Sequence, residues 1–326
     1  MADIHSYGAY LPKFRAPLGE IQAFFGRPGR PRAKALATPA LDEDPLTMAY
    51  EAATRALTGG ATPTAIINVC TTPPFGLRKM GVTLARTLDL EQAATYDITG
   101  HPGALLDGLQ VAAALADAGQ SVLVVVSDHQ VAYEDRVCDM LSAGGAAAFI
   151  VGPEGGIARL GASARTNREI YDVWVLGTER EARYRMEVLF DAYAAAAKGA
   201  IGALAKAGGA ETSSYAKVAA SQPHPQCVKA LGKAGVSGEQ LDGTSFVGDI
   251  GNLGAASVGV ALALALDAAK AGDRVLAFGY GAGEGIATEI EVTGSAPCGI
   301  ADHLAGEPIT LSTYYRWTRG RHVEPH

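Results

Sequence analysis

The stretch "DITGHPGALLDGLQVAAALADAGQSVLVVVS" (residues 97–127) carries the pattern that decides the fold. A second stretch, "DIGNLGAASVGVALALALDAAKAGDRVLAFGY" (residues 249–280), repeats its organisation. Each begins with Asp-Ile and a glycine-rich turn, continues through an alanine- and leucine-rich helix, and ends in an apolar strand. Two copies of one supersecondary unit predict a duplicated architecture.

The composition of the two repeated helices predicts where they lie. A helix that is apolar on all sides must be inside the protein. We therefore expect one central helix from each half, with the turn before it at the heart of the molecule. The unpaired N–H groups and partial positive charge of such a turn can lower a thiol pKa or stabilise an oxyanion. Two converging turns predict a pocket.

The rest of the chain alternates strands and helices. Apolar runs predict strands at residues 65–72, 121–128 and 143–152, and helical spacing predicts helices at 42–57, 77–90 and 179–208. Long apolar strands that alternate with helices favour parallel-rich sheets covered on both faces. The length of 326 residues suits two units of about 150 residues, which we place at 1–160 and 161–326.

Composition excludes several classes of function. A net charge of −7 without a dominant basic face argues against nucleic acid as a partner. The 4 cysteines are scattered and form no CxxC pair, so we expect no metal site. The N-terminus lacks a basic region followed by an apolar run, and no clean apolar stretch of about 20 residues indicates a membrane span. We expect a cytoplasmic protein with reduced cysteines.

The motifs, in their order along the chain, resemble the thiolase superfamily, and within it the branch of 3-hydroxy-3-methylglutaryl-CoA synthase and ketoacyl synthase III. The matching stretches run from residue 7 to about residue 321 and include "YGAYLPKFR", "CTTPPF", "YDITGHPGALLDGL", "SQPHPQ" and "GDRVLAFGYGAG". The resemblance implies an α/β protein with a five-layered αβαβα fold from two duplicated halves. It also implies coenzyme A thioesters as ligands, no tightly bound cofactor, and dimerisation through the first half.

The chain departs from this family at the catalytic positions. The resemblance puts the family's nucleophilic Cys at Pro102, its His at Ser221 and its acidic Glu at Thr71, and only Asn252 keeps the family's residue. Proline has neither a nucleophilic atom nor an N–H group for an oxyanion. A covalent acyl-enzyme at this turn is therefore not expected.

Four other polar side chains are candidates for chemistry. His224, in a proline-flanked loop, can polarise a carbonyl as acid or base, or simply cap the next helix. His101 can face the pocket or a partner subunit. Tyr280, at a strand end among glycines, can be the acid of an aldol cleavage, although core packing is the simpler interpretation. Asn252 can order a turn or hold a water molecule.

Two segments are candidates for binding. The loop "GRPGRPRAK" (residues 26–34) carries Arg27, Arg30, Arg32 and Lys34. The resemblance implies contact with the phosphates of coenzyme A, while a solvated loop explains these charges equally well. The tail "YYRWTRGR" (residues 314–321) mixes aromatic residues with arginines, as interfaces do. The resemblance implies a DUF35-type partner, built from a zinc ribbon and an OB-fold; the alternative is a helix packed on its own chain.

Our leading prediction is a structural subunit, without a nucleophile of its own, in a multi-subunit acyl-CoA acyltransferase or C–C bond-forming or thiolytic complex. It would be a homodimer, or a heteromer with a Cys-bearing thiolase-like subunit, and would bind a DUF35-type protein. The alternative is a retro-aldol lyase that acts on a β-hydroxyacyl-CoA through His224, His101 or Tyr280. A third option is an acyl-CoA-binding or regulatory protein.

Overall fold

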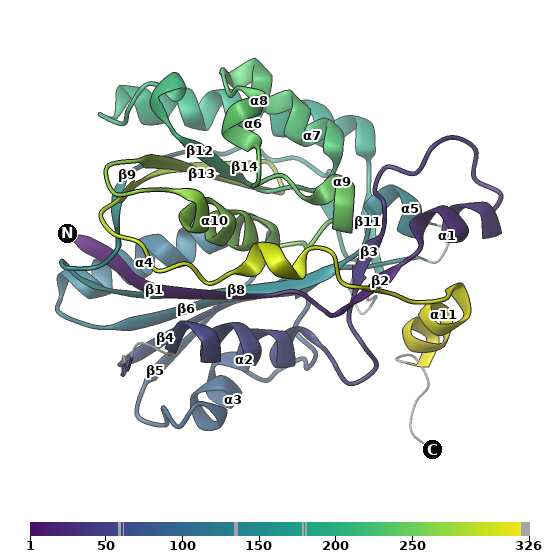
Figure 1. Cartoon of the computed structure of the whole chain (residues 1–326), viewed down its shortest axis with the longest axis horizontal. Helices are drawn as coiled ribbons and strands as arrows, with labels where there is room; N and C mark the ends of the chain where they lie inside the picture. The colour runs from purple at the N-terminus through teal and green to yellow at the C-terminus, as the bar shows by residue number, and fades with distance from the viewer. Residues whose placement is uncertain (58–59, 61, 134–135, 178, 180, 321–326) are drawn as a thin grey trace.

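The elements of the chain stack in alternating layers of helix and sheet, in the order αβαβα (Figure 1). The computed structural model describes residues 1–320 except 58–59, 61, 134–135, 178 and 180. One outer layer holds α2 (Pro45–Ala56) and α3 (Met80–Thr87), the central layer holds α4 (Leu105–Asp117) and α10 (Ala256–Ala268), and the other outer layer holds α6 (Met186–Lys206), α7 (Pro225–Ala230) and α8 (Gly238–Leu241). The predicted fold class is confirmed.

The strands form two sheet layers that are joined along one edge. Their order is β12-β13-β14-β9-β1-β8-β6-β4-β5. The first layer contains β1 (Ala2–Tyr10), β4 (Ala65–Val69), β5 (Ala94–Ile98), β6 (Val122–His129) and β8 (Gly144–Pro153), and the second contains β9 (Ala158–Thr166), β12 (Lys217–Ala220), β13 (Arg274–Gly281) and β14 (Glu284–Val292). Only Asp3 and Ile4 of β1 pair with β9, so the layers can diverge and enclose the central helices.

The sheets mix parallel and antiparallel pairs, so the expectation of parallel-rich sheets overstated the share of parallel pairs. In the two large layers the parallel pairs are β4 with β5, β4 with β6, and β12 with β13. In each half the last strand returns antiparallel, β8 beside β6 and β14 beside β13. The β13–β14 connection is a tight turn in which Ala282 and Gly283 both have positive φ, the conformation that hairpins of this hand require.

The internal repeat is present in three dimensions, with one asymmetry. Each copy runs from a turn through a central helix into a strand, α4 into β6 and α10 into β13. Nearly the whole of α10 is buried, as expected for a helix that is apolar on all sides. Helix α4 is different, because one edge reaches the surface and leaves Val111 43% exposed. Asp107 and Gln110 lie on that partly exposed side and anchor polar contacts described below.

The predicted boundary between residues 160 and 161 falls inside β9, and the division into halves stays a prediction. The C-terminal segment returns to the first half. There β15 (Glu307–Pro308) pairs with β2 (Phe14–Ala16), which pairs with β3 (Leu36–Thr38). Helix α11 (Leu311–Gly320) places the Trp317 ring 5.0 Å from that of Phe14 and the Tyr315 ring 5.2 Å from that of Phe24 on α1 (Leu18–Phe24). The tail packs on its own chain, and Arg321 lies outside the described residues.

The helix predicted at 179–208 begins later, at Met186. Residues Glu181–Tyr184 form β11, which pairs with β10 (Val173–Trp174) and β7 (Val131–Ala132). The pairing of β11 with β7 joins segments about fifty residues apart, so no local sequence pattern predicts it. Among the described residues, α6 is the one helix long and apolar enough to cross a membrane. Half of its most apolar window is buried, and it contacts β9 and β14 as a core helix does.

The close approach of α4 to β13 gives a first prediction. A Cβ atom at Gly103 would lie 2.7 Å from the backbone N of Tyr280, and backbone cannot move aside cheaply. Gly103→Ala should lower the free energy of unfolding by about 1–3 kcal/mol. Gly232→Ala is the matched control, because no atom lies within 4 Å of the added methyl. Urea unfolding of the three proteins measures the difference, and equal midpoints would contradict the close packing.

Candidate functional site

A cavity lies where the two repeated turns meet, as the sequence predicted. Pro102, before α4, and Asn252 and Gly254, before α10, lie on its wall. The space between its walls, together with the open solvent at its mouth, amounts to about 520 Å³. Its other lining residues come from the strand ends and from the segment that leads into α6: Gln130, Met140, Asp172, Val173, Tyr184, Met186, Leu189, Ser221, Gln222, Pro223, Tyr280, Gly281 and Ala282. The wall is mostly apolar, with a few polar groups, as in small-molecule sites.

The elbow before α4 is fixed by β13. A Cβ atom at Gly281 would lie 2.6 Å from the ring carbon Cδ of Pro102, so the proline ring rests directly on the β13 backbone. Opposite it, Ser221 is 2% exposed and its Oγ accepts a hydrogen bond of 3.0 Å from the Tyr280 N–H. The Asn252 side chain folds back locally, since its Oδ1 accepts from the Gly254 N–H at 2.9 Å. These contacts hold both turns rigid around the cavity.

The most acidic part of the wall is a tyrosine–aspartate pair. The Tyr280 hydroxyl donates to Oδ2 of Asp172, and Oδ1 of Asp172 accepts from the Val173 N–H at 2.7 Å. Both side chains are buried, Asp172 completely. Burial, followed by the hydrogen bond to Asp172, raises the pKa of Tyr280 well above its usual range, so the phenol stays protonated at neutral pH. Tyr280 was among the predicted candidates and Asp172 was not, although an acid inside the apolar run "YDVWV" is a signal for it.

His224 caps a helix beside the cavity. Its Nδ1 accepts a hydrogen bond of 3.1 Å from the Gln226 N–H at the start of α7, and its ring lies 5.0 Å from that of Phe190. Pro223 lines the cavity, whereas His224 is outside the lining set. Burial, with a smaller contribution from the charge of Arg32, lowers the pKa of His224 to about 4. The imidazole is therefore neutral at pH 7, in the capping role that the sequence left open.

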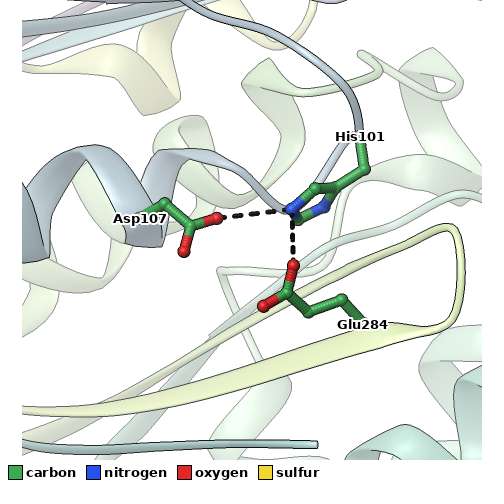
Figure 2. A group of neighbouring side chains, drawn as sticks. All are labelled: His101, Asp107 and Glu284. Carbon is green, nitrogen blue, oxygen red and sulfur yellow. Dashed lines mark ion pairs between the residues drawn. The ribbon is translucent and has the colours of Figure 1, made fainter. Parts of the chain in front are cut away.

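His101 also lies outside the cavity lining, although its neighbour Pro102 is part of it. Figure 2 shows its Nε2 between two carboxylates, 3.3 Å from Oδ2 of Asp107 and 3.0 Å from Oε2 of Glu284. The three side chains come from the elbow, from α4 and from β14, and their ligand atoms lie within 4.8 Å of one another. This spacing is compatible with a metal ion, so the surrounding contacts decide what the cluster does.

Those contacts favour an ion-pair network over a metal centre. The Arg165 guanidinium lies 3.1 Å from both Asp107 and Glu284 and already offsets part of their negative charge. The Gly103 N–H donates to Nδ1 of His101 at 3.0 Å, which keeps the proton of the neutral ring on Nε2, the atom that a metal would need. The cluster joins α4, β9 and β14 and fixes the elbow from the side away from the cavity.

Thr71 lies behind the cavity wall. Its hydroxyl donates to Oδ2 of Asp128 at 2.6 Å, and the Gln130 amide, on the cavity wall, lies 3.5 Å from Thr71 Oγ1. Asp128 is completely buried, and it also accepts from the Ala255 N–H at 2.8 Å and from the Thr72 hydroxyl. Burial raises the pKa of Asp128, against the opposing effect of these hydrogen bonds. Thr71 therefore holds a structural carboxylate.

The basic loop flanks the cavity from the first half. Arg27 forms an ion pair of 2.8 Å with Asp139, next to the lining residue Met140, and Lys34 forms one of 2.7 Å with Asp249. Arg30 and Arg32 are exposed. In Figure 1 the loop between α1 and β3 stands beside α5 (Val137–Met140) and α9 (Val247–Ile250). The four basic residues thus share one side of the molecule but do not form one cluster.

No cysteine is among the residues that line the cavity. Cys70 and Cys227 are completely buried, and burial raises the pKa of both thiols well above the usual range. Burial also raises the pKa of Cys138, and that of Cys298 to about 12. The thiolate is the nucleophilic form, so each of these cysteines is a weak nucleophile at neutral pH.

Comparison with known proteins shows the family. No protein-family model matches the chain. The hydroxymethylglutaryl-CoA synthase of Pyrobaculum aerophilum is 30% identical over 307 residues, which cover 86% of this chain and 85% of that protein. The enzyme of the same name from Aeropyrum pernix is 29% identical over 299 residues, covering 87% and 82%. The chain belongs to the hydroxymethylglutaryl-CoA synthase family.

Solved structures agree on the fold. A crystal structure of an HMG-CoA synthase complexed with CoA superposes with a TM-score of 0.85 at 16% identity, covering 97% of this chain and 89% of the other. The 3-oxoacyl-[acyl-carrier-protein] synthase III of Aquifex aeolicus gives 0.81 at 20% identity, covering 89% and 100%. These likenesses show a thiolase-like fold, and this fold agrees with the family to which the chain belongs.

Within that fold, three of the positions matched to the family's catalytic residues meet at the cavity. Pro102, Ser221 and Asn252 all line it, and Thr71 lies one side chain behind, next to Gln130. His224 and His101 face other contacts, whereas Tyr280 is on the wall. The structure thus brings together the matched positions and Tyr280, and places both histidines outside the lining.

The buried state of His224 predicts a pH-dependent stability. Its pKa is about 4 in the folded protein against an ordinary 6.5, so between these values the unfolded chain binds more protons and stability falls as pH falls. The loss reaches at most about 3 kcal/mol. His224→Asn keeps a good cap and removes the titrating group, so its stability should decline less between pH 6.5 and 4.

Urea midpoints measured at intervals across that range test the expectation. His303→Asn is the control, because His303 is exposed and the substitution is chemically the same. A decline in H224N as steep as in the wild type would show that His224 does not titrate as its burial requires.

Proposed function

We propose that this chain is a thiolase-fold subunit that holds an acyl-CoA thioester without becoming acylated, in a complex for acyl transfer or for making or breaking C–C bonds. The observation that carries the proposal is Pro102 on the cavity wall, at the position matched to the family's nucleophilic Cys. A proline there supplies no attacking atom and no N–H donor. The role of the chain would then be structural, and the thiol chemistry would occur on another subunit.

Two features support a CoA thioester as the ligand. The cavity has apolar walls around a small set of polar groups, which suits an acyl chain and a thioester carbonyl. One protein with the same fold is an HMG-CoA synthase complexed with CoA. The basic loop at residues 26–34 flanks the cavity, with Arg30 and Arg32 exposed, and in this proposal it meets the phosphates of the nucleotide.

The proposed assembly is a homodimer, or a heteromer with a Cys-bearing thiolase-like subunit, together with a DUF35-type zinc-ribbon and OB-fold protein in the cytoplasm. Strand β5 supports pairing of subunits, because it ends the sheet order and carries Tyr96 at 45% exposure. Among the described residues no strand pairs with its outer edge, and such an edge is a template for a further strand. Helix α11 uses Trp317 and Tyr315 on its own chain and leaves Arg316 exposed toward a partner.

The absence of acylation is testable by intact-protein mass spectrometry. After incubation with acetyl-CoA or acetoacetyl-CoA, we expect the wild-type mass unchanged, because its thiols are buried or protonated. Pro102→Cys places a thiol at the start of α4, where the helix N-terminus lowers a thiol pKa. That variant should react with iodoacetamide faster than the wild type, which confirms that the position is reachable. A thioester adduct on the wild-type protein would overturn the proposal.

A second candidate function is favoured by the Tyr280–Asp172 pair. Retro-aldol cleavage of a β-hydroxyacyl-CoA needs a proton acceptor for the hydroxyl and donors for the enolate oxygen, and no thiol. In this alternative the hydroxyl proton moves through Tyr280 to Asp172, the Cα–Cβ bond breaks, and its electron pair forms the enolate of the shorter acyl-CoA. Proton addition at Cα completes the step.

Product analysis decides between the two functions. The protein, alone and with its DUF35-type partner, is incubated with 3-hydroxyacyl-CoA esters, and aldehyde or ketone is measured with the shorter acyl-CoA. If the chain is a lyase, the aldehyde or ketone and the shorter acyl-CoA should form in equal amounts. Tyr280→Phe should lower the rate at which both form by at least about tenfold. Equal turnover in the wild type and in Y280F, or none in either, would leave the structural role.

A further inference from the structure

We infer that Ala282 sets the width of the cavity mouth and thereby selects, by size, the groups that can enter beside Pro102. Ala282 is the first residue of the tight turn between β13 and β14, and it lies on the cavity wall. None of the positions matched to the family's catalytic residues includes it. The role of Ala282 at the mouth follows from the geometry of the turn, whereas its selection among acyl groups rests on the proposed binding of acyl-CoA.

The first argument is where the cavity opens to solvent. Among the described residues that line it, Ala282 is the one that is exposed. The half-buried lining residues complete the rim: Pro102, Val173, Tyr184, Met186 and Pro223. The remaining lining residues are buried and form the interior. A group that enters from solvent therefore passes between the rim residues, of which Ala282 is the most exposed.

The second argument is that the backbone at Ala282 cannot move aside. A Cβ atom at Gly283 would lie 2.1 Å from the carbonyl oxygen of Arg168, and one at Gly281 would lie 2.6 Å from Cδ of Pro102. The Arg168 N–H also donates a hydrogen bond of 3.2 Å to the Gly283 carbonyl oxygen. The backbone on both sides of Ala282 is thus in close contact. Its methyl group is held in place, and it is the one side-chain group between two glycines.

The third argument is the conformation in which this methyl group is kept. Ala282 has a φ of 51°, in the left-handed region. A Cβ atom is unfavourable there, and glycine or asparagine suits such a position in a tight hairpin turn. Glycine at 282 would form the same turn without strain. Retained strain at a site indicates a function for the group that causes it, and here that group stands on the exposed part of the cavity wall.

Two substitutions change the mouth without straining the turn. Ala282→Gly removes the methyl group, and Ala282→Asn adds a larger side chain that a tight turn accepts before glycine. In the Pro102→Cys background, the introduced thiol reports entry through its rates of reaction with iodoacetamide and with the bulkier N-phenylmaleimide. The ratio of the second rate to the first should rise in A282G and fall in A282N. A difference of one methylene in a fitted site changes discrimination about tenfold or more, so we expect at least about tenfold between these two variants.

Leu77→Gly and Leu77→Asn, in the same background, are the matched controls. Leu77 also has a positive φ, is fully exposed and is not among the lining residues. Both changes should leave the ratio of rates unchanged. Urea unfolding shows whether each variant is folded. Neither change at Ala282 should lower the midpoint, because glycine and asparagine both tolerate a positive φ, and if one variant does not fold, the other still decides.

The selection among acyl groups is measured by calorimetry with acetyl-CoA and the branched isobutyryl-CoA, in proteins that keep Pro102. The affinity for isobutyryl-CoA, relative to that for acetyl-CoA, should be higher in A282G than in the wild type and lower in A282N. The reason is steric, because the branch has to fit beside the side chain at position 282.

The outcomes separate this inference from the proposed function. Equal ratios of labelling rates in P102C, P102C/A282G and P102C/A282N would overturn the role of Ala282, whatever the protein binds. The expected order of ratios, with no binding of either ester, supports Ala282 at the mouth and rejects the proposed function. If both esters bind with the same relative affinity in the wild type, A282G and A282N, Ala282 does not select the acyl group.

Discussion

The structure depends on one buried carboxylate at the junction of the two halves. Asp128, the last residue but one of β6, accepts a hydrogen bond from the Ala255 N–H at the start of α10. A completely buried charge is costly, but here two hydroxyls and the positive end of a long helix offset it. Gly254 must be glycine, because it has positive φ and a Cβ would lie 2.3 Å from the carboxylate.

The cavity follows from this constraint. With α10 held against β6, its turn presents Asn252 and Gly254 to the cavity, and the equivalent turn of the first half presents Pro102 from the other side. A second network holds that elbow, because His101 is bound between Asp107 of α4 and Glu284 of β14 and is not among the residues that line the cavity. Two polar clusters outside the cavity thus fix its walls.

Sequence patterns predicted what is local and missed what is distant. The repeated turn, central helix and strand are contiguous, so the fold and the meeting of Pro102, Ser221 and Asn252 could be foreseen through the family resemblance. The strand at Glu181–Tyr184 depends on pairing with β7 and was read as helix. Asp172 meets Tyr280 across 108 residues, and no spacing rule joins them. The exposure of one side of α4 likewise depends on which elements pack beside the helix, and the composition of the helix does not predict those elements.

A site without a nucleophile must discriminate among ligands by non-covalent contacts alone. In a covalent mechanism every thioester reacts through the same carbonyl, and the nucleophile adds a bond that does not depend on the acyl chain. In the proposed function, proline at the elbow removes that common contribution, and differences along the acyl chain would decide which thioester stays bound.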